Sequence, residues 1–175
     1  MQTIIVAIIL ISALVLICLA LVSVNNKHRR RRTAALLANF SKAGTENNLS
    51  FSAQEILNNC ALGLDGIHRK LLVLKKINET NYNSFVIDLN DVNACSKKNI
   101  YKTVNMGGSK VPKLENHLEK IALKFEFTDG RQPIEIPFYS YVDNHALEIE
   151  ELGQKVKPWE IIISQLLKKN VKKIP

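Results

Sequence analysis

Histidines close to carboxylates are the residues in this chain that could perform acid–base chemistry. His117 lies two positions before Glu119, and Asp143 lies two positions before His145. An imidazole titrates near neutral pH, so a histidine oriented by a carboxylate can act as a general base. Catalysis also requires several polar groups that converge on one pocket, and the sequence identifies no such set. We therefore expect that the chain is not an enzyme, and catalysis is the least supported hypothesis.

Sequence motifs that bind cofactors or metal ions are missing. The chain holds no nucleotide-binding loop, no Gly-x-Ser-x-Gly elbow, no His-Glu-x-x-His pair and no cysteine–histidine spacing typical of zinc sites. The stretch Met106–Lys110 is rich in glycine but lacks the spacing of a phosphate-binding loop. We expect no cofactor and no metal site, and we identify no small-molecule substrate.

Basic side chains form the other group whose residue type suggests binding, in this case to anions. Lys27, Arg29, Arg30, Arg31 and Arg32 all precede the first acidic residue of the chain. From that acidic residue onward, the chain holds 18 of its 24 Lys and Arg and all 16 of its Asp and Glu. Most of the formal net charge of +8 is therefore concentrated near the N-terminus. A nucleic-acid-binding domain needs a strongly basic face, and we expect no such partner. We expect this block to contact a membrane and its anionic lipids.

An apolar segment before the basic block predicts the location of the protein. Thr3–Val24 holds 22 consecutive residues without charge, which as a helix rise about 33 Å, against about 30 Å for the hydrocarbon core of a bilayer. No basic residue precedes it, as a signal peptide would require, and basic flanks stay on the cytoplasmic side. We therefore predict an anchor at residues 1–26, a basic segment and linker at 27–50, and a cytosolic domain at 51–175 of a single-pass inner (cytoplasmic) membrane protein.

The cysteines and asparagines bear on that orientation. Cys60 and Cys95 form no CxxC pair or disulfide framework, which agrees with a reducing compartment. Asn39, Asn48 and Asn78 each begin an Asn-x-Ser/Thr pattern that could accept a glycan in a lumen. These three patterns keep the opposite topology open.

Local patterns between residues 51 and 140 favour about six short strands. Asp65-Gly66 separates two apolar runs and predicts a hairpin with a type I′ turn and a positive φ at Gly66. Ser52 and Glu55 fit a capping box, so a helix beginning at Ser52 is the alternative. Farther along, apolar residues alternate with polar ones from Ile121 to Phe127, and Thr128–Arg131 predicts a second turn. Pro133 and Pro137 make the strand after it an edge or a bulged strand.

The C-terminal region changes to helical periodicity. An apolar stripe recurs every three or four residues and contains Leu152, Val156, Trp159, Ile163 and Leu166. Pro158 lies within the stripe and predicts either a kink or two helical segments. We expect Trp159 to fill the core, together with the aromatic residues of the strands: Phe125, Phe127, Phe138, Tyr139 and Tyr141.

The order of these elements resembles the pleckstrin-homology-like fold, in which a bent antiparallel sheet is closed by a C-terminal helix. The resemblance covers about residues 51 to 170 and rests on the two Asp-Gly hairpins and the terminal helix. The chain is also similar to small uncharacterised bacterial single-pass membrane proteins with one cytosolic domain. Inositol-lipid-binding relatives use basic residues around the first hairpin, and His68, Arg69 and Lys70 follow Asp65-Gly66 here. The resemblance implies an α+β fold and, weakly, binding of lipid headgroups.

Two functional hypotheses follow. The first is a membrane-tethered cytosolic module that docks another protein at a sheet edge or groove, because tethering lets even a weak binding surface act. The alternative is an anionic-lipid-binding module at the membrane surface. It would combine the basic block with a second patch of basic residues: Arg69, Lys70, Lys97, Lys98 and Lys102.

Overall fold

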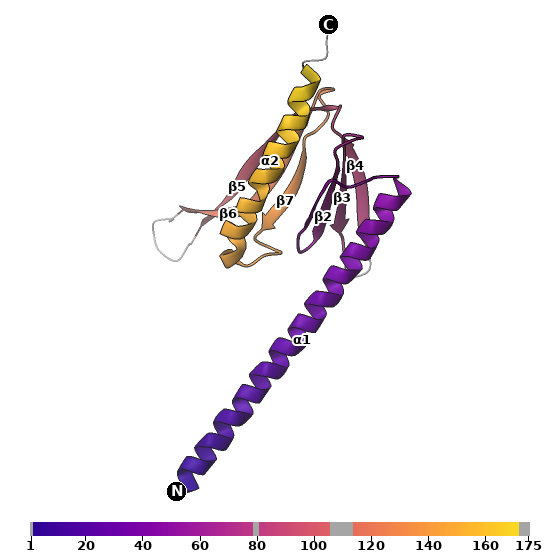
Figure 1. Ribbon diagram of the computed structural model, residues 1–175. Coiled ribbons are helices and arrows are strands. Elements are labelled where there is room, and N and C mark those ends of the chain that lie inside the picture. The colour runs from indigo at the N-terminus through magenta and orange to yellow at the C-terminus, as the bar shows by residue number, and fades with distance from the viewer. Residues whose placement is uncertain (1, 79–80, 106–113, 172–175) are drawn as a thin grey trace.

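Two antiparallel sheets and two long helices give the chain an α+β architecture (Figure 1). The computed structural model describes residues 2–78, 81–105 and 114–171. The first sheet has four strands in the order β1 (Ala53–Ile56), β2 (Cys60–Asp65), β3 (Lys70–Lys76) and β4 (Tyr82–Asp88). The second has three strands, β5 (Val92–Asn105), β6 (Leu114–Phe127) and β7 (Ile134–Ser140). The helices are α1 (Gln2–Glu46), the short 3₁₀ helix η1 (Ala146–Glu148) and α2 (Ile149–Val171). The predicted single sheet is thus corrected to two.

The predicted transmembrane helix is contradicted. Among the described residues, no helix offers an apolar stretch of the length that a bilayer crossing requires. On α1 the described apolar side chains that precede the first basic residue, Lys27, lie between Val15 and Val24, whereas a spanning helix needs about 20 apolar residues. The side chains of residues 2–14 lie outside the description. The single-pass topology and the inner-membrane location depended on this anchor and are corrected with it.

Two hydrophobic clusters stabilise the fold. The larger one joins the facing sides of both sheets to α2, and its fully buried members include Leu62, Leu64, Leu71, Leu123, Phe125 and Ile163. The smaller one lies on the other side of the four-stranded sheet, where the last part of α1 packs through Leu36, Phe40 and Ala43 on Ala61, Leu72 and Leu74. Because both faces are covered, every residue of β2 is buried. The helix extends to Glu46, so most of the predicted linker is helical.

The hairpin predicted at Asp65-Gly66 forms, but its turn differs. Asp65 pairs with Lys70, so the loop contains the four residues Gly66–Arg69 in place of a two-residue type I′ turn. The positive φ lies at Arg69, at 56°, and not at Gly66. The alternative helix at Ser52 is wrong, because β1 begins at Ala53 and pairs with β2.

The second predicted turn and the proline-containing strand are confirmed. Gly130 has a φ of 75° in the β6–β7 turn, a conformation that glycine adopts without strain. β7 is an edge strand, and its pairing with β6 shifts where Ile121 faces Tyr139 and Ala122 faces Pro137. Pro137 therefore lies beside a bulge, where the missing N–H is tolerated.

The C-terminal helix is also as predicted. Leu152, Val156, Trp159 and Ile163 are buried against the sheets, and Trp159 is 4% exposed. The helix runs through Pro158 as one segment.

Candidate interaction surface

The basic block of the sequence lies on α1. The side chains of Lys27, Arg30, Arg31 and Arg32 are exposed, and that of Arg29 lies outside the described residues. Lys27, Arg30 and Arg31 form no ion pair with any described residue. Lys27, Arg30 and Arg31 therefore present positive charge that no described acidic residue pairs with.

The second group of basic residues is not brought together on one surface. Arg69 ends the β2–β3 loop and is half-buried, and its Nε and Nη2 have no hydrogen-bond partner among the described residues. Lys70 begins β3, whereas Lys97, Lys98 and Lys102 lie on β5 in the other sheet. The Nζ of Lys97 donates to the carbonyl of Gly153 on α2 at 3.3 Å, and the Nζ of Lys98 lies 3.1 Å from Glu135 Oε1 on β7. Two of these lysines thus have structural partners within the fold.

The histidine–carboxylate pair at residues 143 and 145 takes part in local structure. Asp143 Oδ1 accepts a hydrogen bond from Asn59 Nδ2 at 2.9 Å, and the backbone N–H of His145 donates to Glu148 Oε2 at 3.2 Å. These bonds tie the β7–α2 connection to the β1–β2 turn and cap η1. His117 and Glu119 lie on β6. Among the described residues, no group of three or more metal-ligating side chains could hold a metal ion.

A histidine–carboxylate pair that sequence reasoning missed lies in the β2–β3 loop. Asp65 is fully buried, and it accepts hydrogen bonds from the backbone N–H groups of Ser50, Ile67 and His68 at 2.9–3.0 Å. The ring Nδ1 of His68 lies 2.8 Å from Asp65 Oδ2. Hydrogen bonds from His68 and Ser50 hold the pKa of Asp65 far below its usual range. The aspartate preceding a turn was the available signal, since such residues often bond the backbone two or three positions on.

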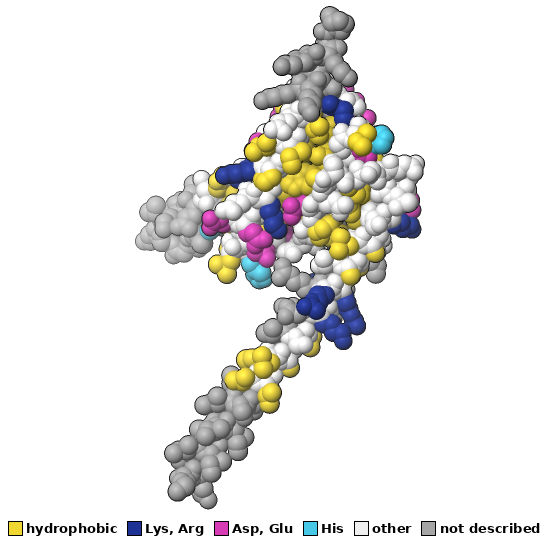
Figure 2. Space-filling model, viewed as in Figure 1, with side chains coloured by type: hydrophobic (Ala, Val, Ile, Leu, Met, Phe, Trp, Pro, Cys, Tyr) yellow, Lys and Arg dark blue, Asp and Glu magenta, His cyan; other side chains and the backbone are white. Residues whose placement is uncertain are grey.

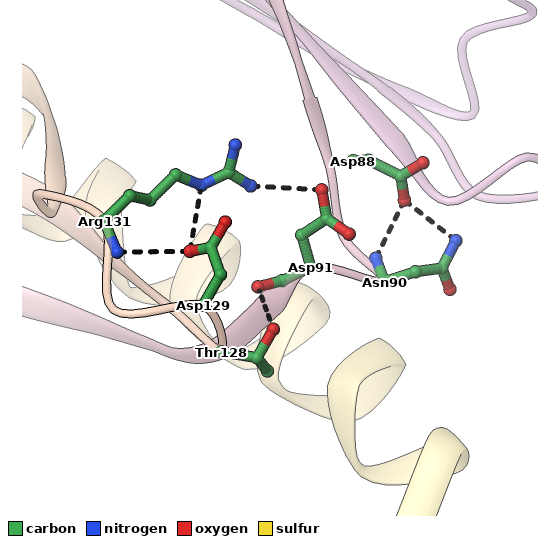
Figure 3. A network of polar contacts seen from close by, with 6 residues as sticks. All are labelled: Asp88, Asn90, Asp91, Thr128, Asp129 and Arg131. Atoms are coloured by element: carbon green, nitrogen blue, oxygen red, sulfur yellow. Dashed lines mark hydrogen bonds and ion pairs between the residues drawn. The ribbon is translucent and has the colours of Figure 1, made fainter.

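A second polar network joins the β4–β5 corner to the β6–β7 turn (Figure 3). Arg131 lies 3.1 Å from Asp91 Oδ2 through Nη2 and 3.5 Å from Asp129 Oδ1 through Nε, and it stacks 3.8 Å over the ring of Phe127. The N–H and hydroxyl of Thr128 both donate to the carbonyl of Asp91. The contacts link the two sheets at this corner and leave the carboxylates paired or hydrogen-bonded, so we assign the network a structural role.

The opposite end of the sheets carries two adjoining pockets. One, of about 240 Å³, is lined by residues of α1, the end of β1, the β1–β2 turn, the β7–α2 connection with η1, and the start of α2: Thr33, Ile56, Leu57, Asn58, Asn144, Glu148, Glu151, Leu152 and Lys155. A smaller one, of about 30 Å³, shares Leu57, Asn58 and Asn144 and reaches Cys60 and Asp143. We call this region, residues 57–59 and 141–155, the end surface. In Figure 1 it lies at the lower end of β7 and α2, toward the projecting half of α1.

Three large apolar side chains project from the end surface. Tyr141, Val142 and Leu147 are 70%, 86% and 96% exposed. The prediction that Tyr141 fills the core is therefore wrong, because β7 ends at Ser140 and the chain turns outward there. Periodicity along the strand could not reveal where the strand ends.

The connection that carries these side chains is fixed by polar bonds. Asn144 accepts from the N–H of Ser140 through Oδ1 at 3.0 Å and donates to Glu148 Oε2 through Nδ2 at 3.0 Å. The N–H of Tyr141 donates to the carbonyl of Glu119 on β6 at 2.9 Å. The exposed apolar groups are therefore held in position by the body of the protein.

Comparison with protein-family models, curated proteins and solved structures finds no match to this chain. The surface itself therefore carries the functional argument.

Proposed function

We propose that this chain is a protein-interaction module that binds a protein partner through the end surface. The observation that carries the proposal is the exposure of Tyr141, Val142 and Leu147 within seven consecutive residues. Single exposed apolar residues are common, but clustered ones that are rimmed by polar groups are typical of interaction sites. Tyrosine is also enriched at the centre of such interfaces.

The rigidity of the connection supports this proposal. A binding surface that is already ordered loses less conformational entropy on association than a mobile loop does. Asn144 bonds both ends of the connection, and Asn59 ties it to the β1–β2 turn through Asp143. The adjoining pocket offers space for a side chain of the partner.

The test compares two exposed β-branched apolar residues, one on the end surface and one far from it. Val142 is 86% exposed on the end surface, and Ile67 is 83% exposed in the β2–β3 loop, at the other end of the strands. We expect Val142→Ser to abolish capture of the partner by the full chain, and Ile67→Ser to leave it unchanged. Equal recovery of the same protein by wild type and Val142→Ser would refute the proposal.

A further inference from the structure

Unpaired charges of opposite sign lie on the two sides of the larger pocket. Asp143, Glu148 and Glu150 make no ion pair with any described residue, and their hydrogen-bond donors are neutral groups. On the α1 side, Lys27, Arg30 and Arg31 are exposed and equally unpaired among the described residues. Figure 2 shows acidic side chains over the lower end of α2 and basic ones on α1 below them, on the same face.

The pocket fixes the relative position of the two charged regions. Thr33 lines the pocket from α1, and Arg30 lies one helical turn before it on the same side of the helix. Glu148 lines the pocket from η1, and Glu151, which pairs with Lys155 at 3.2 Å, lines it from the start of α2. An acidic region and a basic region therefore adjoin, with the exposed apolar side chains of Tyr141, Val142 and Leu147 beside them.

This arrangement restricts the partner. A purely basic partner would be attracted by the start of α2 but repelled by the block on α1, and a purely acidic partner would meet the reverse. Juxtaposed like charges oppose association. The surface that fits both regions carries an acidic and a basic patch in the same spacing.

We propose that the partner of the end surface is a second copy of this chain, related by a two-fold axis. In a two-fold interface the same patch is used by both copies, so each contact occurs twice. The acidic region of one copy then faces the basic block of the other, reciprocally, and the exposed apolar side chains are covered between them. This inference rests on the proposed function and names its partner.

The test reverses each set of charges in the full chain and measures mass by sedimentation equilibrium. One variant carries Asp143→Lys with Glu150→Lys and thereby also loses the hydrogen bond from Asn59 to Asp143. The other carries Arg30→Glu with Arg31→Glu. Glu148 is left in place because it caps η1. In a dimer of either variant alone, like charges lie opposite each other. We expect the dissociation constant of that dimer to rise by about tenfold or more. An equimolar mixture of the two restores opposite charges at both contacts, so we expect heterodimers close to wild-type affinity. Formation of these heterodimers also shows that both variants fold.

The outcomes separate this inference from the proposed function. A monomeric wild type, or a self-association that neither reversal weakens, would overturn the second copy as partner. If, in that case, the wild type captures another protein and Val142→Ser does not, the proposed function is still supported and only the identity of the partner is wrong. A wild-type dimer whose mixture of variants stays monomeric would also refute the charge pairing.

Discussion

The carboxylate of Asp65 is fully buried while His68, whose Nδ1 lies 2.8 Å from it, keeps 58% of its side chain exposed. The aspartate is therefore the interior member of the pair, and three backbone N–H groups converge on it. One of them belongs to Ser50, which precedes β1, so a single side chain joins the β2–β3 loop to the segment that follows α1. The hydrogen bonds of Asp65 hold a four-residue loop, where the sequence had favoured a two-residue turn.

Removing the charge of Asp65 should destabilise the fold. Asp65→Asn keeps the shape but places an amide N–H group against donors, so we expect a loss of about 1.5–3 kcal/mol, the range for hydrogen bonds to a charged group. His68→Ala removes only the exposed partner and should cost less than about 1 kcal/mol. Urea unfolding of the full chain measures both values. Similar losses for the two variants would show that the histidine holds the loop.

The stability of the protein should fall in acid because of the same residue. The pKa of Asp65 is lowered in the folded state, so its contribution is fully present above the unfolded value of about 3.9 and is lost as the pH falls toward the folded pKa. We expect the unfolding midpoint to be insensitive to this group at neutral pH and to decline below about pH 4. Asp65→Asn should show a shallower decline, and an identical acid profile in both proteins would contradict this assignment.

Gly63 should tolerate no side chain, although it lies within a strand and has no special φ. A Cβ there would meet Phe40 Cζ at 2.5 Å and Phe51 Cδ1 at 2.6 Å, and these two rings stack with centroids 4.8 Å apart between α1 and the sheet. We expect Gly63→Ala to cost about 1–3 kcal/mol through overpacking.

Gly66→Ala is the matched control, since its Cβ would meet only the Ser52 side chain, at 3.1 Å, and its φ is not positive. Thermal melting of both variants checks this. A larger effect at Gly66 would mean that the loop needs glycine there after all.

The three cysteines should differ in reactivity. Burial raises the pKa of Cys60 and that of Cys95 to about 12, whereas Cys18 is exposed on α1. Because the thiolate is the nucleophile, we expect one fast-reacting thiol per folded chain at pH 8, assigned to Cys18. Labelling with a thiol reagent before and after unfolding measures this, and Cys18→Ser should remove the fast phase. Three equally fast thiols in the folded chain would refute the buried positions of Cys60 and Cys95.

Several elements could be predicted from the sequence because their signals are local. The stripe through Leu152, Val156 and Ile163 defines the buried side of α2, and the alternation before Phe127 defines β6. Gly130 marked a turn, and Pro137 marked an irregular edge strand. Each of these depends on residues a few positions apart, whose spacing sets which side chains share a face.

The remaining features depend on contacts between distant segments, and only the tertiary structure decided them. Gly63 is constrained by α1 and by Phe51, not by its own strand. Tyr141 is exposed because β7 ends one residue earlier, and its neighbourhood on the end surface combines the β1–β2 turn, the start of α2 and α1. The exact end of a strand and the meeting of three distant segments produce no periodic pattern in the sequence. The candidate site could therefore be identified only from the tertiary structure.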